Sequence, residues 1–292
     1  MWKCMILAML WSPYGTLQWD EFYRYLIAFL CIGQPWTIFH YDLSQEQHGA
    51  PCLSGAQVVQ PGHYILLSIT GQPLRVGFYS AVPRGRFPVH SNAYPRTNHY
   101  RERARARDGK CLITGSGTQT WSRLHAAHIF SRAHDIEWVE KGYPSKITDT
   151  ADEALIGGPT KIDSVQNVLT MRCDLHNAWD NFEFAVDPNN NYRITAFTNG
   201  NEDINGLYLQ LGHIRDPTMR PLDELFTDHF MQCLFKHMKG AGELGTCDDH
   251  EDDSGDESDL KIGGAKVEEE GVELALAEEV FDRLAVWHEL RI

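Results

Sequence analysis

The sequence predicts an α+β fold, because patterns typical of strands and patterns typical of helices occur in separate parts of its 292 residues. Three runs rich in aromatic and β-branched residues, at residues 36–41, 63–69 and 74–79, predict strands. Between residues 221 and 240, apolar side chains recur every three or four positions, which predicts an amphipathic helix. A hydrophobic content of 42% is sufficient for a core, so the chain is expected to be globular in the main.

The N-terminal third predicts a small β-rich module. Residues 1–34 mix apolar and aromatic side chains at helical spacing and are interpreted as an N-terminal helix or an unusual leader, with no function assigned. Residues 35–100 contain the three strand-like runs, with a turn at Gly71 and Pro73 between the last two, and then a connector that contains Pro and Arg residues.

The middle third carries the residues that indicate a function. Residues 101–108, rich in arginine and alanine, predict a short basic helix. Three motifs follow it: Ala126-Ala127-His128-Ile129, an apolar strand that ends in a histidine, Ser164-Val165-Gln166-Asn167, and Leu175-His176-Asn177-Ala178-Trp179-Asp180. Phosphodiester hydrolysis needs a base, a cation and a group that orients the base, and His128, Asn167 and His176 are residue types that can supply these three roles.

These motifs, preceded by Cys111-Leu112-Ile113-Thr114-Gly115, resemble those of the HNH endonuclease-like domains (His-Me finger, ββα-metal superfamily) found in many fungal proteins. The resemblance implies a ββα-metal (HNH) finger within residues 101–200, in which two strands and a helix bring the three side chains together. It also implies that His128 is the general base, that Asn167 orients it, and that His176 on the helix binds one divalent metal ion, Mg²⁺, Mn²⁺ or similar.

The metal site has other candidate ligands. If the segment around His176 is helical, Asp180 lies on the same face and can share the metal, or it only caps or pairs locally. Many HNH enzymes have an acid or a histidine directly before the base, but this position is Ala127 here. His125, Asp174 or Asp180, or else water, would therefore complete the coordination of the metal.

No structural zinc is expected. Many HNH proteins carry two Cys-x-x-Cys pairs, whereas here Thr114 follows Cys111 and His176 follows Cys173 at that spacing. Two thiolates are too few for a closed four-ligand zinc site. Both cysteines are interpreted as buried small hydrophobic residues.

Charge is distributed unevenly along the chain, whose net charge is −14. Residues 81–132 hold ten Lys or Arg against two acids, a local +8, whereas residues 243–292 hold seventeen acids against four bases and so carry −13. A basic stripe beside the motifs suits phosphate contact, although such a run is also typical of an ordinary solvated surface. The residues predicted to bind nucleic acid are Arg101, Arg103, Arg105, Arg107, Lys110 and Arg132.

The C-terminal part predicts a hairpin and helical additions to the core. Residues 184–188 and 192–197 resemble two strands joined by a polar turn, and residues 201–242 include the amphipathic helix. Residues 243–265 are an acidic linker, with eight carboxylates and no Lys or Arg between residues 248 and 259, and are expected to be disordered. Residues 266–292 contain a last amphipathic helix, which is expected to dock on the body or on a protein partner.

Two functions of different classes follow from the sequence. The first is a metal-dependent HNH endonuclease that hydrolyses phosphodiester bonds in DNA, with RNA left open as a substrate. The alternative is a catalytically degenerate HNH module that acts in nucleic-acid binding or protein interaction. Seven scattered cysteines favour a reduced, intracellular protein, nuclear or cytoplasmic. The apolar run at residues 25–32 is shorter than the about 20 residues of a membrane span, so no membrane anchor is expected.

Deleting residues 243–292 should tighten DNA binding. The acidic linker is tethered to a basic stripe and competes with phosphate there at about millimolar effective concentration. Fluorescence anisotropy with a labelled duplex should show a gain in affinity that shrinks as salt is raised. A truncated protein that is soluble and monomeric yet binds DNA no better at low salt contradicts autoinhibition, and an aggregated one indicates that the last helix completes the fold.

Overall fold

The computed structural model describes residues 6–9, 17–78, 84, 99–117 and 121–238. The chain divides into two compact units, Met1–Phe235 and Lys236–Ile292, and the elements below belong to the first, except for the end of helix α6. The acidic linker and the last helix expected from the sequence lie outside the described residues. No helix among these residues is both long and apolar enough to cross a membrane.

The predicted β-rich N-terminal module is confirmed. Its four-stranded antiparallel sheet has the order β1 (Ile6–Met9), β5 (Gly62–Ser68), β3 (Trp36–Asp42) and β4 (Gln47–Cys52). Helix α1 (Trp19–Phe29) precedes the sheet's central strands, and the ring of Trp19 meets that of Tyr64 on β5 edge to face. The third strand-like run of the sequence is reduced to β6 (Gly77–Phe78), which pairs with β2 (Leu30–Cys31).

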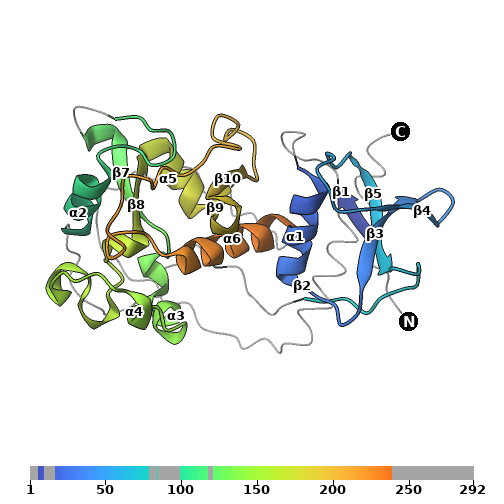
Figure 1. Ribbon diagram of the computed structural model, residues 1–292, viewed down its shortest axis with the longest axis horizontal. Helices are drawn as coiled ribbons and strands as arrows, with labels where there is room; N and C mark the ends of the chain where they lie inside the picture. Colours follow the sequence, from blue (N-terminus) through green and yellow to red (C-terminus); the bar gives the residue numbers. More distant parts are fainter. Residues whose placement is uncertain (1–5, 10–16, 79–83, 85–98, 118–120, 239–292) are drawn as a thin grey trace, which may run out of the picture. The chain divides into compact units, whose positions relative to one another are not determined.

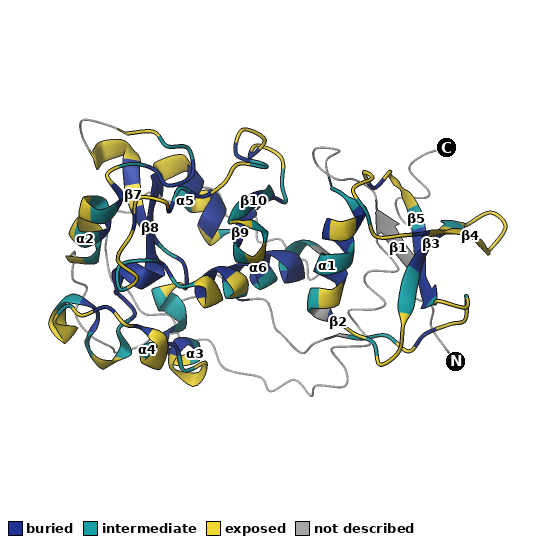
Figure 2. Cartoon of the chain, in the orientation of Figure 1, coloured by how far each residue is buried: buried dark blue, intermediate teal, exposed yellow. Residues whose placement is uncertain are grey.

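Two strands and a helix form the predicted ββα finger (Figure 1). Strand β7 (Leu124–His128) pairs antiparallel with β8 (Val168–Arg172), and helix α5 (Cys173–Asp180) follows β8 without a connecting loop. Strand β8 is almost entirely buried, as Figure 2 shows, because it lies in the main hydrophobic core. The register places His128 opposite Val168, at the end of β7.

The segment between β7 and β8 is not a plain loop. It contains helices α3 (Asp135–Glu140) and α4 (Tyr143–Lys146) and several short 3-10 turns, of which Val165–Asn167 leads into β8. Trp138 anchors α3 in the core, where its indole nitrogen donates a hydrogen bond to the carbonyl of Thr160 at 2.7 Å. The insertion is therefore packed against the finger and can hold side chains at fixed positions.

A hairpin and a long helix complete the core on the C-terminal side. Strands β9 (Phe184–Asp187) and β10 (Arg193–Ala196) pair antiparallel, and their turn ends in Asn191 and Tyr192 with φ of 53° and 59°. Asparagine tolerates this left-handed conformation better than most residues. Helix α6 (Asp223–Met238) buries Phe226 in the main core. Both the hairpin and the helix agree with the sequence pattern.

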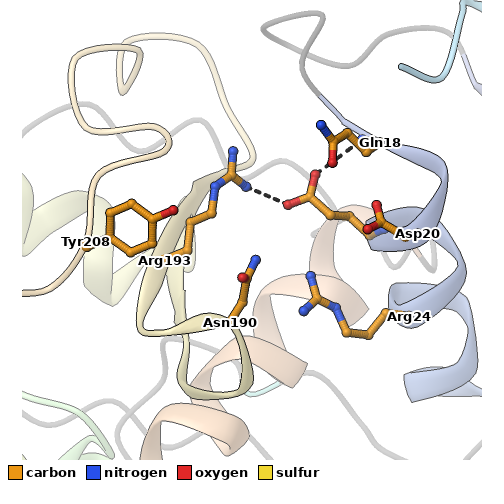
Figure 3. A pocket seen from close by; sticks show the side chains of 7 residues that line it. Gln18, Asp20, Arg24, Asn190, Arg193 and Tyr208 are labelled. Atoms are coloured by element: carbon orange, nitrogen blue, oxygen red, sulfur yellow. Dashed lines mark hydrogen bonds and ion pairs between the residues drawn. The ribbon is translucent and has the colours of Figure 1, made fainter. Parts of the chain in front are cut away.

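Helix α1 contacts the hairpin through charged side chains (Figure 3). Arg193 donates to Glu21 at 2.6 Å. Arg24 pairs with Asp187, which Figure 3 does not draw, at 3.1 Å. An open polar cleft of about 490 Å³ lies beside these pairs and is lined by Gln18, Asp20, Glu21, Arg24, Asn190, Arg193 and Tyr208. None of its lining residues belongs to β7, β8 or α5, so this cleft is separate in sequence and structure from the finger.

Helix α2 (His99–Asp108) packs on the two strands of the finger. Ala104 is fully buried with Ala126 and Val168, and the ring of Tyr100 packs against the same cluster. At its end, the carboxylate of Asp108 accepts a hydrogen bond from the backbone amide of Thr170 on β8 at 2.9 Å. These contacts bring the N-terminal end of α2 next to the end of β7.

Candidate active site

His128 stands at the end of β7 with most of its side chain covered. Its Nε2 atom lies 3.0 Å from Oδ1 of Asp163, and the ring of Tyr100 packs against the imidazole at a tilt of 50°, with ring centroids 4.6 Å apart. The indole nitrogen of Trp179 donates to the backbone carbonyl of His128 at 3.0 Å. The imidazole thus has a carboxylate at one nitrogen and a tilted aromatic ring packed against it.

Asn167 is fully buried, and its side chain bonds to backbone groups rather than to the imidazole of His128. Its Oδ1 accepts from the amide of Phe130 at 2.8 Å, and its Nδ2 donates to the carbonyls of Phe130 and Ile162 at 3.0 and 2.9 Å. Its own carbonyl accepts from the amide of Ile129 at 2.8 Å. Asn167 therefore fixes the chain that directly follows His128, and its hydrogen bonds reach the imidazole only through that backbone.

Asp163 is a site residue that the sequence did not reveal. Its side chain is 1% exposed, and Nε of Arg132 approaches the same Oδ1 atom at 3.4 Å. Burying a carboxylate is costly unless it is paired, which makes its position beside His128 and Arg132 informative. Because Asp163 precedes the Asn motif without any distinctive pattern of its own, only the path of the chain shows its place in the site.

His176 on α5 lies between two other polar side chains. Its Nδ1 is 3.2 Å from Nδ1 of His125 on β7, and its Nε2 is 3.3 Å from Oδ2 of Asp180. The helical spacing of His176 and Asp180 is confirmed. Asp174, the other acid considered for this site, pairs with Arg172 instead, at 3.0 Å.

Burial lowers the pKa of His176 below its ordinary value. The carboxylate of Asp180 opposes this effect and raises the pKa, whereas the neighbouring His125 and the charge of Arg101 add to the lowering. A lowered pKa favours the neutral imidazole near neutral pH, and the neutral imidazole is the form that can bind a metal.

The distance between two imidazole nitrogens near His176 matches the spacing of two ligands of one cation. Two nitrogen ligands at the usual 2.0–2.1 Å from one ion lie about 3.3 Å apart at a tetrahedral angle, close to the 3.2 Å between Nδ1 of His125 and Nδ1 of His176. Within the described residues, no group of three or more His, Cys, Asp or Glu side chains is arranged to hold a metal ion. Water and substrate phosphate commonly supply the remaining ligands of ions such as Mg²⁺.

The four arginines of α2 fall into two pairs. Residues four apart share a helix face, and Arg103 and Arg107 both turn toward buried partners: Arg103 pairs with Asp149 at 2.7 Å, while Arg107, 3% exposed, pairs with Asp108. Arg107 also donates to three backbone carbonyls, those of Val165, Val168 and Met219. Because its guanidinium lies in the interior, Arg107 is not accessible to a DNA phosphate, although its charge alone had suggested such a contact.

Of the other predicted nucleic-acid residues, Arg101 is exposed, whereas Arg105, Lys110 and Arg132 are half-buried. The guanidinium carbon of Arg101 lies 5.7 Å from the ring centroid of Tyr100. Arg105 lies 5.3 Å from the ring of Trp121, an exposed aromatic residue just before β7. Lys110 donates to Gln210, and Arg132 lies against Asp163. Of this set, Arg101 lies next to the ring that covers His128.

One interpretation of the cysteines needs correction. Cys111 is buried, as expected, but Cys173 is exposed. Cys173 is the first residue of α5, whose buried side consists of Leu175, Ala178 and Trp179. Its position at the start of the helix leaves it outside this buried side.

Residues 111–187 match the model of a protein family described as HNH endonuclease. The matched segment contains β7, β8, α5 and β9, and therefore His125, His128, Asp163, Asn167, His176 and Asp180, whereas helix α2 precedes it. The chain thus contains an HNH endonuclease domain with the ββα-metal fold. A comparison with curated proteins and one with solved structures gave no match.

Proposed function

We propose that this protein is a metal-dependent HNH endonuclease that hydrolyses phosphodiester bonds in DNA. The observation that carries the proposal is the arrangement of His128. One of its ring nitrogens faces a buried carboxylate, and the other, Nδ1, makes no hydrogen bond to the described part of the chain. An imidazole held in this way can accept a proton from water at the end of β7.

The proposed reaction is an in-line displacement at phosphorus. Nδ1 of His128 takes a proton from a water molecule, the oxygen of that water forms a bond to phosphorus, and the bond from phosphorus to one ester oxygen breaks. The departing oxygen takes a proton from solvent. A divalent cation, when bound, neutralises charge on the phosphate and on the leaving oxygen.

The residues proposed to hold the cation are His176 and one neighbour. His125 faces Nδ1 of His176 and Asp180 faces its Nε2, so the two neighbours lie at opposite nitrogens of the same ring. We favour the two imidazoles as ligands, with Asp180 fixing the orientation of His176, because metal-bound histidines usually donate their second nitrogen to a carboxylate or carbonyl. The alternative pairs His176 and Asp180 as ligands.

A degenerate nucleic-acid-binding module is the second candidate function. It is favoured by Ala127 directly before the base and by the lack of a three-ligand cluster within the described residues. A cleavage assay with supercoiled plasmid distinguishes the enzyme from the binding module. An enzyme nicks it with added Mg²⁺, Mn²⁺ or Ni²⁺ and stops in chelator, whereas a binding module shifts the DNA and leaves it intact. A labelled RNA run in parallel tests the substrate class.

Arg101→Ala should weaken DNA binding and make it less dependent on salt. Each lost phosphate contact reduces the slope of log affinity against log salt by about 0.9. Arg75→Ala is a matched control, because Arg75 is also exposed but belongs to the N-terminal module. Affinity and slope are measured by fluorescence anisotropy across a salt series. Equal slopes for the wild type and Arg101→Ala would remove Arg101 from the proposed DNA surface.

A further inference from the structure

A buried carboxylate reaches the candidate base from the segment that precedes Asn167. Oδ1 of Asp163 lies 3.0 Å from Nε2 of His128, although the two residues are 35 positions apart in the sequence. The residue belongs to the densely buried stretch that leads into β8, so it is part of the interior and not a mobile surface acid. Its contact with the imidazole therefore calls for a chemical role.

The backbone on both sides of this contact is fixed by the same side chain. Asn167 bonds to the carbonyl of Ile162, directly before Asp163, and to both backbone groups of Phe130, two residues after His128. The backbone at Gly157 also passes close to Asp163. Gly157 has φ of +92°, and a Cβ there would lie 3.4 Å from Oδ2 of Asp163. Asn167 thus ties together the two backbone segments that carry the carboxylate and the imidazole.

The chemistry of the pair determines which nitrogen is the base. An ionised carboxylate can only accept a hydrogen bond, so Nε2 of a neutral His128 must carry the hydrogen and Nδ1 must carry the lone pair. We propose that Asp163 is the positioning residue of this site, which holds His128 in the Nε2–H tautomer and so presents Nδ1 to water. This inference rests on the proposed nuclease function, in which His128 takes the proton.

Asp163 also stabilises the protonated form of His128 in this scheme. When Nδ1 takes a proton, the imidazolium that forms keeps its Nε2–H bond to a carboxylate, so the positive charge is stabilised where it develops. Arg132, 3.4 Å from the same oxygen, is a second cation partner that remains with the carboxylate throughout. Asp163 itself neither gains nor loses a proton in this scheme.

The tautomer can be measured without DNA or metal. In full-length protein with ¹⁵N-labelled histidine at pH 8, long-range ¹H–¹⁵N correlation spectra distinguish Nε2–H from Nδ1–H, and the signals of His128 are identified by their loss in His128→Gln. We expect Nε2–H in the wild type and a mixed or Nδ1–H population in Asp163→Asn and Asp163→Ala. An Nδ1–H tautomer in the wild type, or an unchanged tautomer in both folded variants, overturns the proposal.

Asp149→Asn is the matched control, because Asp149 is another buried carboxylate nearby whose bonds go to Arg103, Ser164 and backbone amides. It should keep the wild-type tautomer of His128, and a tautomer change equal to that of Asp163→Asn would overturn the assignment. Asp163→Asn should also lower kcat for plasmid cleavage by about 10²–10⁴-fold, by analogy with tautomer-setting aspartates in other hydrolases. If the wild type does not cleave DNA, the nuclease proposal fails, and the spectra still decide the role of Asp163.

Discussion

His128→Ala should abolish metal-dependent cleavage of DNA while the protein stays folded. A general base contributes about 10²–10⁴-fold to a reaction rate, and this contribution is lost when the imidazole of His128 is removed. The substitution leaves Asp163 with Arg132 as its remaining side-chain partner, which should cost about 1–3 kcal/mol. For a domain of about 150–250 residues each kcal/mol changes Tm by about 2–4 °C, so this loss should lower Tm by about 2–12 °C.

The measurement is the rate of plasmid nicking at saturating metal, together with a thermal melt of each variant. His213→Ala is the control, because His213 is exposed and lies outside the finger, so its removal should change neither the rate nor Tm. A well-folded His128→Ala protein that cleaves at the wild-type rate would exclude His128 as the base. A variant that is inactive because it has unfolded would be recognised from its melt.

The parts of the site that could be predicted from the sequence are local ones. His128 ends an apolar run, so its position at the end of a strand follows from the residues next to it. His176 and Asp180 are four residues apart, and this spacing alone places them together once the segment is helical. The α+β class was predictable from local strand and helix patterns, whereas the ββα finger was implied by the resemblance of the motifs to those of HNH endonuclease-like domains.

The contacts that the sequence could not predict join distant segments. His125 meets His176 because the register of β7 and β8 places His125 opposite Met171, close to where α5 begins. Asp163 contacts His128 because the insertion after β7 folds back onto the end of that strand. No helical or strand-like pattern in the sequence predicts this path. The residues around these contacts give no pattern that predicts them. The contacts result from the pairing of β7 with β8 and from the path of the insertion.

The basic stripe shows a different limit of sequence reasoning, since a count of charges does not say which of them face solvent. Arg84 is 4% exposed, pairs with Glu137 and Asp228, and lies 3.9 Å from the ring centroid of Phe130. Arg103 and Arg107 also serve interior acids and carbonyls. The helical period could have separated these two from Arg101, because positions two apart on a helix point in nearly opposite directions.

The last prediction concerns the cation. His176→Ala should lower the affinity for Mn²⁺, measured by isothermal titration calorimetry, and its loss of cleavage should be partly recovered at high metal concentration. The reason is that His176 belongs to both of the ligand pairs that the geometry allows. Asp174→Asn is the control, because this acid is bonded to Arg172, and its removal should leave metal binding unchanged. Unchanged Mn²⁺ binding in His176→Ala would contradict its role as a ligand.

Two further substitutions at this site separate the two ligand pairs. If both imidazoles bind the cation, His125→Ala should lose as much affinity as His176→Ala, whereas Asp180→Asn should lose about 10–100-fold, the usual effect of removing a group that orients a ligand. If the cation instead lies at Nε2 of His176, Asp180→Asn should match His176→Ala and His125→Ala should bind Mn²⁺ like the wild type. The first ranking follows from the 3.2 Å between the two Nδ1 atoms, which suits two ligands of one ion, and from a carboxylate placed at the opposite nitrogen of His176.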